Sequence, residues 1–314
     1  MRARGHRHRP PQALQGQRHG DRAARPTLAL PGRLRDVRGR PRLPPARRRG
    51  VHRPERAPSA HPRAPGPGLS AVPVDVVPTV EAATPAALDG ATVLVIDVLR
   101  ASTTIVAALR SGCAGVLPAA DPAAARRRLA GLPPGRGCLA GERRGEPIPG
   151  FDLGNSPLEM TPARVQGRWV VLTTSNGTRA LLAARRAARV GVAALVNLGA
   201  AAAWARAGGR AIVLLCAGER GRPALEDQVA AGLLVERLLG ADPAPAPTAA
   251  AAAALALARP YRDDVARLAI DAPWARRLAD RGRAADVRAC LALDTTTLVP
   301  VYLTDVDKVL AGPR

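Results

Sequence analysis

Short apolar runs rich in β-branched residues recur along the chain from residue 92 onward, and each ends in a polar loop. The runs at 92–96, 169–172 and 211–215 are almost wholly apolar rather than alternating, which is typical of strands buried on both faces of a parallel sheet. A weaker run of the same kind covers 192–196. We therefore predict these four segments as strands of one sheet.

Helix signals lie between these runs. Asp121 followed by Pro122 is an N-cap with a proline in the first turn. Further helices are predicted over 178–189, 223–239, 249–259 and 262–281, with a proline-rich connector at 241–248. Two closing strands, at 286–293 and 298–303, lie close together in the sequence, which favours a mixed sheet. The alternation predicts an α/β fold, a three-layer α/β/α sandwich with a largely parallel, mixed sheet.

The first 70 residues have a different composition from the rest. They hold 18 Arg and three acidic residues, and so carry +15 of the formal net charge of +22. They are dense in Pro and Gly and lack Phe, Tyr, Trp, Ile and Lys. Such a stretch buries too little apolar surface to offset the entropy of ordering it. We predict a disordered basic leader over 1–71, followed by one catalytic domain over 72–314.

Two interpretations of the leader remain open. It reads as coding sequence translated from a start upstream of the true one, with Val72 or Val74 as the natural first residue. Alternatively, it is a basic arm that attracts nucleic acid through phosphate charge, although it lacks aromatic residues for base stacking. For the folded domain we expect no nucleic-acid partner.

Missing residue types exclude several enzyme classes. All five histidines lie in the leader and the whole chain has one lysine, Lys308, so the domain cannot use a Ser-His-Asp triad or a Walker lysine. Four cysteines without CxxC spacing argue against a zinc site and a disulfide framework. The longest apolar stretch, the alanines at 249–258, is too short to cross a bilayer. We expect a cytoplasmic protein without a membrane partner.

The loop after the first strand is the first candidate for chemistry. Asp97 comes where the strand ends, a usual place for a metal-binding carboxylate, and Arg100 offers a bidentate fork for an anion. Ser102 and Thr103 can begin a helix whose free N–H groups favour an anion. The alternative is an ordinary helix cap with a solvated Asp and Arg.

The loop at 173–179 is dense in hydroxyl groups. Ser175, Asn176, Thr178 and Arg179 follow a buried strand and precede a helix, where backbone N–H groups can form an anion cradle. The alternative is a capped turn with Thr178 as the cap. Because ligands bind outside the carboxyl ends of strands in open α/β sheets, these loops are expected to share one crevice.

The loop at 216–227 supports two kinds of site. Glu226 and Asp227 fall in the first turn of a helix, where they complement the helix dipole or bind a hard cation. Beside Asp97 they favour magnesium. Cys216 and Arg222 instead have the CX5R spacing of cysteine-dependent phosphatases, but Glu219 between them would repel phosphate. A small buried cysteine at a strand end explains Cys216 equally well.

The segment at 141–159 holds too many Gly and Pro residues for regular structure. Glu142, Arg143 and Asn155, together with the single Phe of the chain, Phe151, favour a substrate lid. The alternative is a surface loop with Phe151 packed beneath it.

Taken together, these segments resemble the 2-phosphosulfolactate phosphatase (ComB) family. The resemblance lies in VIDVLRASTTI at 95–105, GERRGEPIPGFDLGNSPLE at 141–159, TTSNGTRAL at 173–181, CAGERGRPALEDQVAAG at 216–232 and DVRACLALDTTTLVP at 286–300. It implies Mg²⁺-dependent hydrolysis of a phosphate ester on a small anionic acid, with 2-phosphosulfolactate giving 3-sulfolactate and phosphate. In archaea this reaction serves coenzyme M biosynthesis.

Roles for individual residues follow when the chemistry of the four segments is combined with the family resemblance. Magnesium would be held by Asp97, Glu226 and Asp227, while Arg100, Arg179 and the 175–178 turn would hold the substrate's acid groups. Asp97 or Glu142 would take the proton from water, because the domain has no histidine. Two alternative functions stay open: a cysteine-dependent phosphatase and a non-catalytic anion-binding protein. Assembly as a homodimer also stays open.

Overall fold

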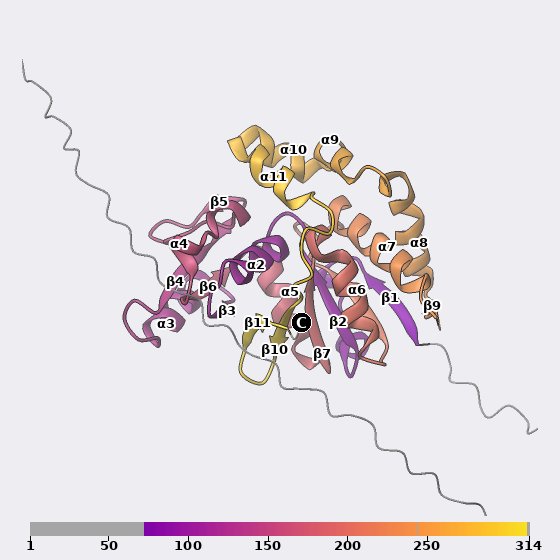
Figure 1. The fold of residues 1–314 in the computed structure, drawn as a ribbon, viewed down its shortest axis with the longest axis horizontal. Coiled ribbons are helices and arrows are strands. Elements are labelled where there is room, and N and C mark those ends of the chain that lie inside the picture. The colour runs from indigo at the N-terminus through magenta and orange to yellow at the C-terminus, as the bar shows by residue number, and fades with distance from the viewer. Residues whose placement is uncertain (1–71, 243, 313–314) are drawn as a thin grey trace, which may run out of the picture. The chain divides into compact units, whose positions relative to one another are not determined.

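A computed structural model of the chain describes residues 72–242 and 244–312 (Figure 1). The predicted basic leader, 1–71, lies outside the described residues.

The described residues form a sheet of 11 strands with the order β5-β4-β6-β3-β11-β10-β7-β2-β8-β1-β9. Its strands are β1 Pro73–Val77, β2 Thr92–Ile96, β3 Gly115–Pro118, β4 Gly137–Arg143, β5 Glu146–Pro147, β6 Trp169–Thr173, β7 Arg189–Ala193, β8 Ile212–Cys216, β9 Ala246–Pro247, β10 Pro300–Leu303 and β11 Lys308–Ala311.

Two blocks of parallel strands make up this sheet. One block is β9-β1-β8-β2-β7 and the other is β3-β6-β4. The hairpin β10–β11 lies between them, antiparallel to β7 on one side and to β3 on the other. The sheet is therefore mixed, as predicted, and the two parallel blocks run in opposite directions.

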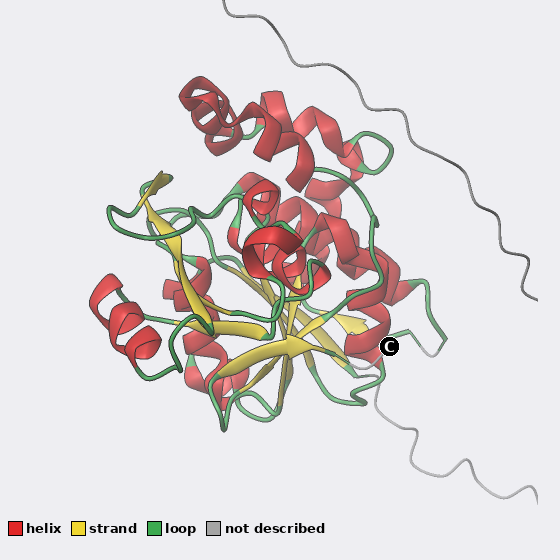
Figure 2. Cartoon of the chain, turned by 60° about the vertical axis from the view of Figure 1, so that its left-hand side comes forward, coloured by secondary structure: helices red, strands yellow, loops and turns green. Residues whose placement is uncertain are grey.

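Helices cover both faces of the sheet (Figure 2). Along β2, Leu94 and Ile96 pack with α6, α7 and α8, whereas Val93 and Val95 pack with α2 and α5. This alternation confirms the three layers. The helices are α1 Pro85–Leu88, α2 Ala101–Arg110, α3 Pro122–Ala130, α4 Pro162–Val165, α5 Gly177–Ala183, α6 Leu198–Arg206, α7 Leu225–Leu239, α8 Ala249–Ala258, α9 Leu268–Asp271, α10 Pro273–Leu278 and α11 Ala284–Cys290.

Several predicted elements are wrong or displaced. The predicted strand at 286–293 is helix α11 instead, which buries Asp286, Val287 and Cys290 on one face. The predicted helix over 262–281 is broken into α9 and α10, because Pro273 cannot continue a helix from the preceding turn. The strand predicted at 192–196 is β7, three residues earlier. The helix predicted over 178–189 is α5, which ends at Ala183.

The segment at 141–159 is more regular than predicted. Strand β4 continues through Arg143 and pairs with β5 in a short hairpin, whereas the remainder is irregular apart from one turn of 3-10 helix at Pro157–Glu159. Helices α9, α10 and α11 lie together on one side of the molecule (Figure 1), and this side carries the candidate site.

Candidate active site

A cavity of about 530 Å³ lies where the predicted loops meet. All three strand-end loops and the 141–159 segment contribute to it, together with α10. Its lining residues are Asp97, Leu99, Arg100, Glu142, Arg144, Gly145, Asn155, Ser175, Asn176, Glu219, Arg220 and Trp274.

The loop after β6 reaches this cavity by an unexpected path. Strand β6 belongs to the block that runs opposite to β2, so the two loops do not share one edge of a parallel sheet. Helix α5 instead packs against β2 and places Gly177 beside Asp97. A Cβ atom at Gly177 would lie 2.6 Å from Asp97 Oδ2, so this close approach requires glycine.

Asp97 is the carboxylate at the centre of the site. It is buried, and its Oδ1 accepts a hydrogen bond from the N–H of Ala101 at 3.2 Å. Burial, together with repulsion from the Glu142 carboxylate, raises the pKa of Asp97 to about 6, against the lowering effect of the Ala101 N–H and the Arg100 charge.

Glu226 and Asp227 line a second, much smaller space of about 20 Å³ that also borders Asp97. Asp227 Oδ1 accepts from the N–H of Val98 and Oδ2 from that of Gly218, so this side chain joins the loops after β2 and β8. Among the described residues, Glu226 Oε2 is buried without a hydrogen-bond partner. Burial raises the pKa of Glu226 to about 7, and burial with repulsion from Asp97 raises that of Asp227 well above its ordinary value.

In the described part of the chain, no three His, Cys, Asp or Glu side chains are already arranged as a metal site. Magnesium, however, usually binds one or two carboxylates and completes its shell with waters and substrate phosphate. The orphaned Glu226 oxygen and the three mutually repelling carboxylates fit such an ion. The small space is also large enough for one atom of this size.

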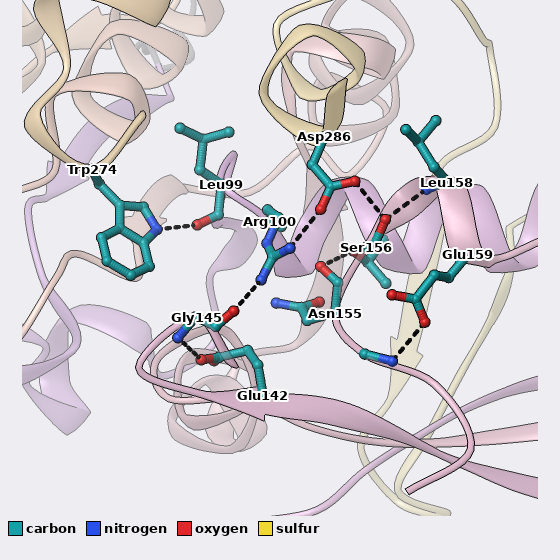
Figure 3. A network of polar contacts seen from close by, with 12 residues as sticks. Leu99, Arg100, Glu142, Gly145, Asn155, Ser156, Leu158, Glu159, Trp274 and Asp286 are labelled. Atoms are coloured by element: carbon teal, nitrogen blue, oxygen red, sulfur yellow. Dashed lines mark hydrogen bonds and ion pairs between the residues drawn. The ribbon is translucent and has the colours of Figure 1, made fainter. Parts of the chain in front are cut away.

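Arg100 is held by two distant segments (Figure 3). Its Nη1 donates to Asp286 Oδ2 at 2.6 Å and its Nη2 donates to the carbonyl of Gly145 at 3.0 Å. Ser156 Oγ donates to the other oxygen of Asp286 at 2.5 Å. The guanidinium is buried, and Asp286 largely neutralises its charge. Arg100 therefore connects two segments at the wall of the cavity, and little of its charge is free to bind an anion.

Glu142, like Arg100, connects separate segments of the chain through hydrogen bonds. Its Oε1 accepts from the N–H of Ser175 at 2.7 Å, and its Oε2 accepts from the N–H of Gly145 at 2.7 Å and from Ser175 Oγ at 3.2 Å. These bonds join the β4–β5 hairpin to the loop after β6. Asn155 lies nearby with its Oδ1 buried and, within the described residues, without a partner.

Five residues predicted to bind substrate do not line the cavity. The hydroxyls of Ser102, Thr103 and Thr178 donate instead to the backbone carbonyls of Val95, Val98 and Thr174. Arg143 donates to Thr173 Oγ1, and Arg179 pairs with Glu81 on the surface. Ser175, Asn176 and Asn155 do line it. Sequence reasoning missed Arg144, Arg220, Trp274, Ser156 and Asp286.

The structure disfavours a cysteine nucleophile. Cys216 is fully buried, its Sγ donates to the carbonyl of Asp227 at 3.6 Å, and burial raises the pKa of its thiol well above the ordinary value. Arg222, the partner in the CX5R spacing, is exposed. A thiolate would have no stabilising charge in that position.

Comparison with known proteins identifies the family of this chain. Residues 77–305 match the family described as 2-phosphosulpholactate phosphatase. The chain belongs to this family. Membership confirms the predicted enzyme class, a phosphoric monoester hydrolase.

Curated members of the 2-phosphosulfolactate phosphatase family extend the match. A probable 2-phosphosulfolactate phosphatase of Symbiobacterium thermophilum is 37% identical over 215 residues, which cover 68% of this chain and 92% of the relative. One of Gloeobacter violaceus is 39% identical over 208 residues, covering 65% and 85%. One of Deinococcus radiodurans is 49% identical over 148 residues, covering 46% and 61%.

The matched region of the family spans every segment that lines the cavity, from Asp97 to Trp274. Within the part of the chain that the structure describes, no helix is long and apolar enough to cross a membrane.

Proposed function

We propose that this chain hydrolyses the phosphate ester of 2-phosphosulfolactate, giving 3-sulfolactate and phosphate, with Mg²⁺ as cofactor. The observation that carries the proposal is a cavity of about 530 Å³ lined by Asp97 and by two exposed arginines, Arg144 and Arg220. Asp97 also borders the small space beside it, which the carboxylates of Glu226 and Asp227 line. Family membership supports the substrate class.

Asp97, Glu226 and Asp227 would hold the magnesium ion, and the ion would neutralise negative charge on the phosphate. Glu226 is the strongest candidate, because among the described residues its buried Oε2 lacks any hydrogen-bond donor. Burial is the main cause of the raised pKa values of Asp97 and Glu226, and repulsion from neighbouring carboxylates adds to it.

The chain's own residues position the substrate and handle the proton. Asp97 is the carboxylate we assign to accept the proton from water, because Glu142 already accepts three hydrogen bonds. Asn155 and Asn176 line the cavity and can donate amide N–H groups to substrate oxygens. Trp274 covers the site from α10 and reduces its contact with water.

Phosphate release by the full chain from 2-phosphosulfolactate tests the proposal, with Mg²⁺ and with EDTA. We expect release that needs Mg²⁺, and a fall of about 10²-fold or more for Asp97→Asn. Cys216→Ser and Asp121→Asn serve as controls that should retain activity, since Asp121 only caps α3. Release that persists in EDTA and is lost in Cys216→Ser would contradict the proposal. No release at all would favour an anion-binding protein.

A further inference from the structure

Two tight turns that line the cavity have the same unusual composition. The β4–β5 hairpin turns through Arg144 and Gly145, with φ values of 57° and 87°. The loop after β8 turns through Arg220 and Gly221, with φ values of 51° and 73°. Glu219 and Arg222 close this second turn by exchanging backbone hydrogen bonds at 2.8 and 2.9 Å.

Both turns place an arginine where another residue is favoured. Two-residue turns with positive φ at both positions prefer Asn-Gly, Asp-Gly or Gly-Gly, because a long side chain is strained there. Such strain is retained where the side chain has a function. The two arginines belong to separate loops, and both line the same cavity.

The two guanidinium groups are also available to a ligand. Arg144 and Arg220 are exposed, and within the described residues neither guanidinium makes a hydrogen bond or an ion pair. Glu219, the nearest acidic neighbour of Arg220 along the chain, is paired with Arg277. Arg100, in contrast, is buried and bound to Asp286.

Helix α10 and the turn after it hold both arginine turns in place. Arg281 Nη1 donates to the carbonyl of Arg144 at 2.6 Å, and Arg277 pairs with Glu219 beside Arg220. The guanidinium groups of Arg277 and Arg281 lie 5.2 and 5.8 Å from the ring centre of Trp274. Arg277 and Arg281 thus hold the two turns, while the side chains of Arg144 and Arg220 remain unpaired among the described residues.

Arg144 and Arg220 border the large cavity but not the small space at the carboxylates. We infer that these two arginines bind the sulfonate of the substrate and thereby determine its specificity. A sulfonate has three oxygens and can accept bidentate forks from two sides, whereas a carboxylate matches one fork. The inference rests on the proposed function, because it assigns the sulfonate of that function's substrate to these two arginines.

Arg144→Asn and Arg220→Asn are the variants that test this inference. Asparagine tolerates positive φ, so each variant should melt at the same temperature as the wild type or about 1–3 °C higher. With 2-phosphosulfolactate, we expect KM to rise about 10- to 100-fold in each variant, since one charge-assisted hydrogen bond is lost. The kcat should stay within about threefold. Arg186→Asn is the matched control, an exposed arginine outside the cavity.

A second substrate separates sulfonate recognition from binding of the other groups. 2-Phospholactate lacks the sulfonate, so its KM should be high in the wild type and should change less than about threefold in both variants. Equal losses on the two substrates, or an unchanged KM for 2-phosphosulfolactate, would overturn the inference.

Direct binding distinguishes failure of this inference from failure of the proposed function. Calorimetry of the full chain with 3-sulfolactate should show binding that weakens about 10-fold or more in each Asn variant, and lactate should bind far more weakly. Binding that depends on both arginines would uphold the inference even if the wild type released no phosphate. Absence of 3-sulfolactate binding by the wild type would overturn it.

Discussion

Glu226 shows at the scale of one residue how the site departs from a stable protein interior. A buried carboxylate is normally paired or hydrogen-bonded, because desolvation penalises its charge. Within the described residues, Glu226 Oε2 has no such partner, and Asp97 and Asp227 add repulsion rather than compensation. Buried acidic groups that lack a partner in this way are typical of functional sites, including those that bind a cation.

Glu226→Gln should therefore stabilise the metal-free protein at high pH. The folded-state pKa of Glu226 is raised from 4.5 to about 7, so its favourable contribution is present below pH 4.5 and is lost as the pH rises through 7. At pH 8 the loss is about 3 kcal/mol, which glutamine avoids. Urea unfolding in EDTA at pH 5 and pH 8 measures this difference.

The control for Glu226→Gln is Glu81→Gln, which changes an exposed carboxylate. It should leave the free energy of unfolding within about 0.5 kcal/mol at both pH values. A metal-free Glu226→Gln protein that is less stable than the wild type at pH 8 would show that Glu226 has a partner in solution.

At the scale of elements, α10 and α11 connect the site to the last part of the chain. Trp274 on α10 donates from Nε1 to the carbonyl of Leu99 at 3.0 Å, and Asp286 on α11 binds both Arg100 and Ser156 (Figure 3). These contacts fix the loop after β2 between two helices. The conformation of this loop therefore depends on residues more than 170 positions later in the chain.

Asp286→Asn should cost about 3–5 kcal/mol of unfolding free energy, because Arg100 would be left as a buried, uncompensated charge. Replacing Arg100 by Met as well should recover part of this loss, since the double variant removes the charge. Asp89→Asn, in the exposed pair with Arg186, is the matched control and should change stability by less than about 1 kcal/mol. Urea unfolding of the wild type, Asp286→Asn, Arg100→Met and the double variant provides the cycle, with Asp89→Asn measured beside them. Equal losses in Asp286→Asn and Asp89→Asn would contradict the role of the buried pair.

The same elements show where sequence reasoning succeeds and where it fails. Strands β2, β6 and β8 are strongly apolar and were predicted within one or two residues. Strands β3 and β11 have only four residues each, so no local pattern distinguishes them. Asp97, Glu226 and Asn155 were predicted at the site from their loops. The ion pair between Arg100 and Asp286 could not be predicted, because 186 positions separate the two residues in the sequence.

At the scale of the whole molecule, the hairpin β10–β11 determines how the two halves of the site meet. It joins two parallel blocks that run in opposite directions. Asp307 in its turn binds Arg128 of α3 on one side and Arg185, which follows α5, on the other. Strand twist accumulates by about 20–25° per strand across such a sheet, so ends that point apart in a flat diagram can converge. The cavity is therefore assembled by the entire fold.

Binding of Mg²⁺ should accordingly stabilise the entire fold, and by more at pH 8 than at pH 5.5. Protons compete with the metal for carboxylates whose pKa values are raised, to about 6 for Asp97 and about 7 for Glu226. At pH 5.5 these groups are largely protonated, whereas at pH 8 they are charged and repel one another in the metal-free protein. A ligand at 100 times its Kd contributes about 2.7 kcal/mol, or roughly 5–10 °C in a domain of this size.

Thermal unfolding of the full chain with MgCl₂, and with NaCl at equal ionic strength, measures this effect. We expect a rise in Tm with MgCl₂ that shrinks as the pH falls from 8 to 5.5, and little change with NaCl. Glu226→Gln should remove most of the rise at pH 8, because it deletes one ligand and the repulsion that the metal relieves. A rise of the same size at both pH values would place the ion elsewhere. A rise that Glu226→Gln leaves intact would exclude Glu226 as a ligand and leave Asp97 and Asp227 to hold the ion.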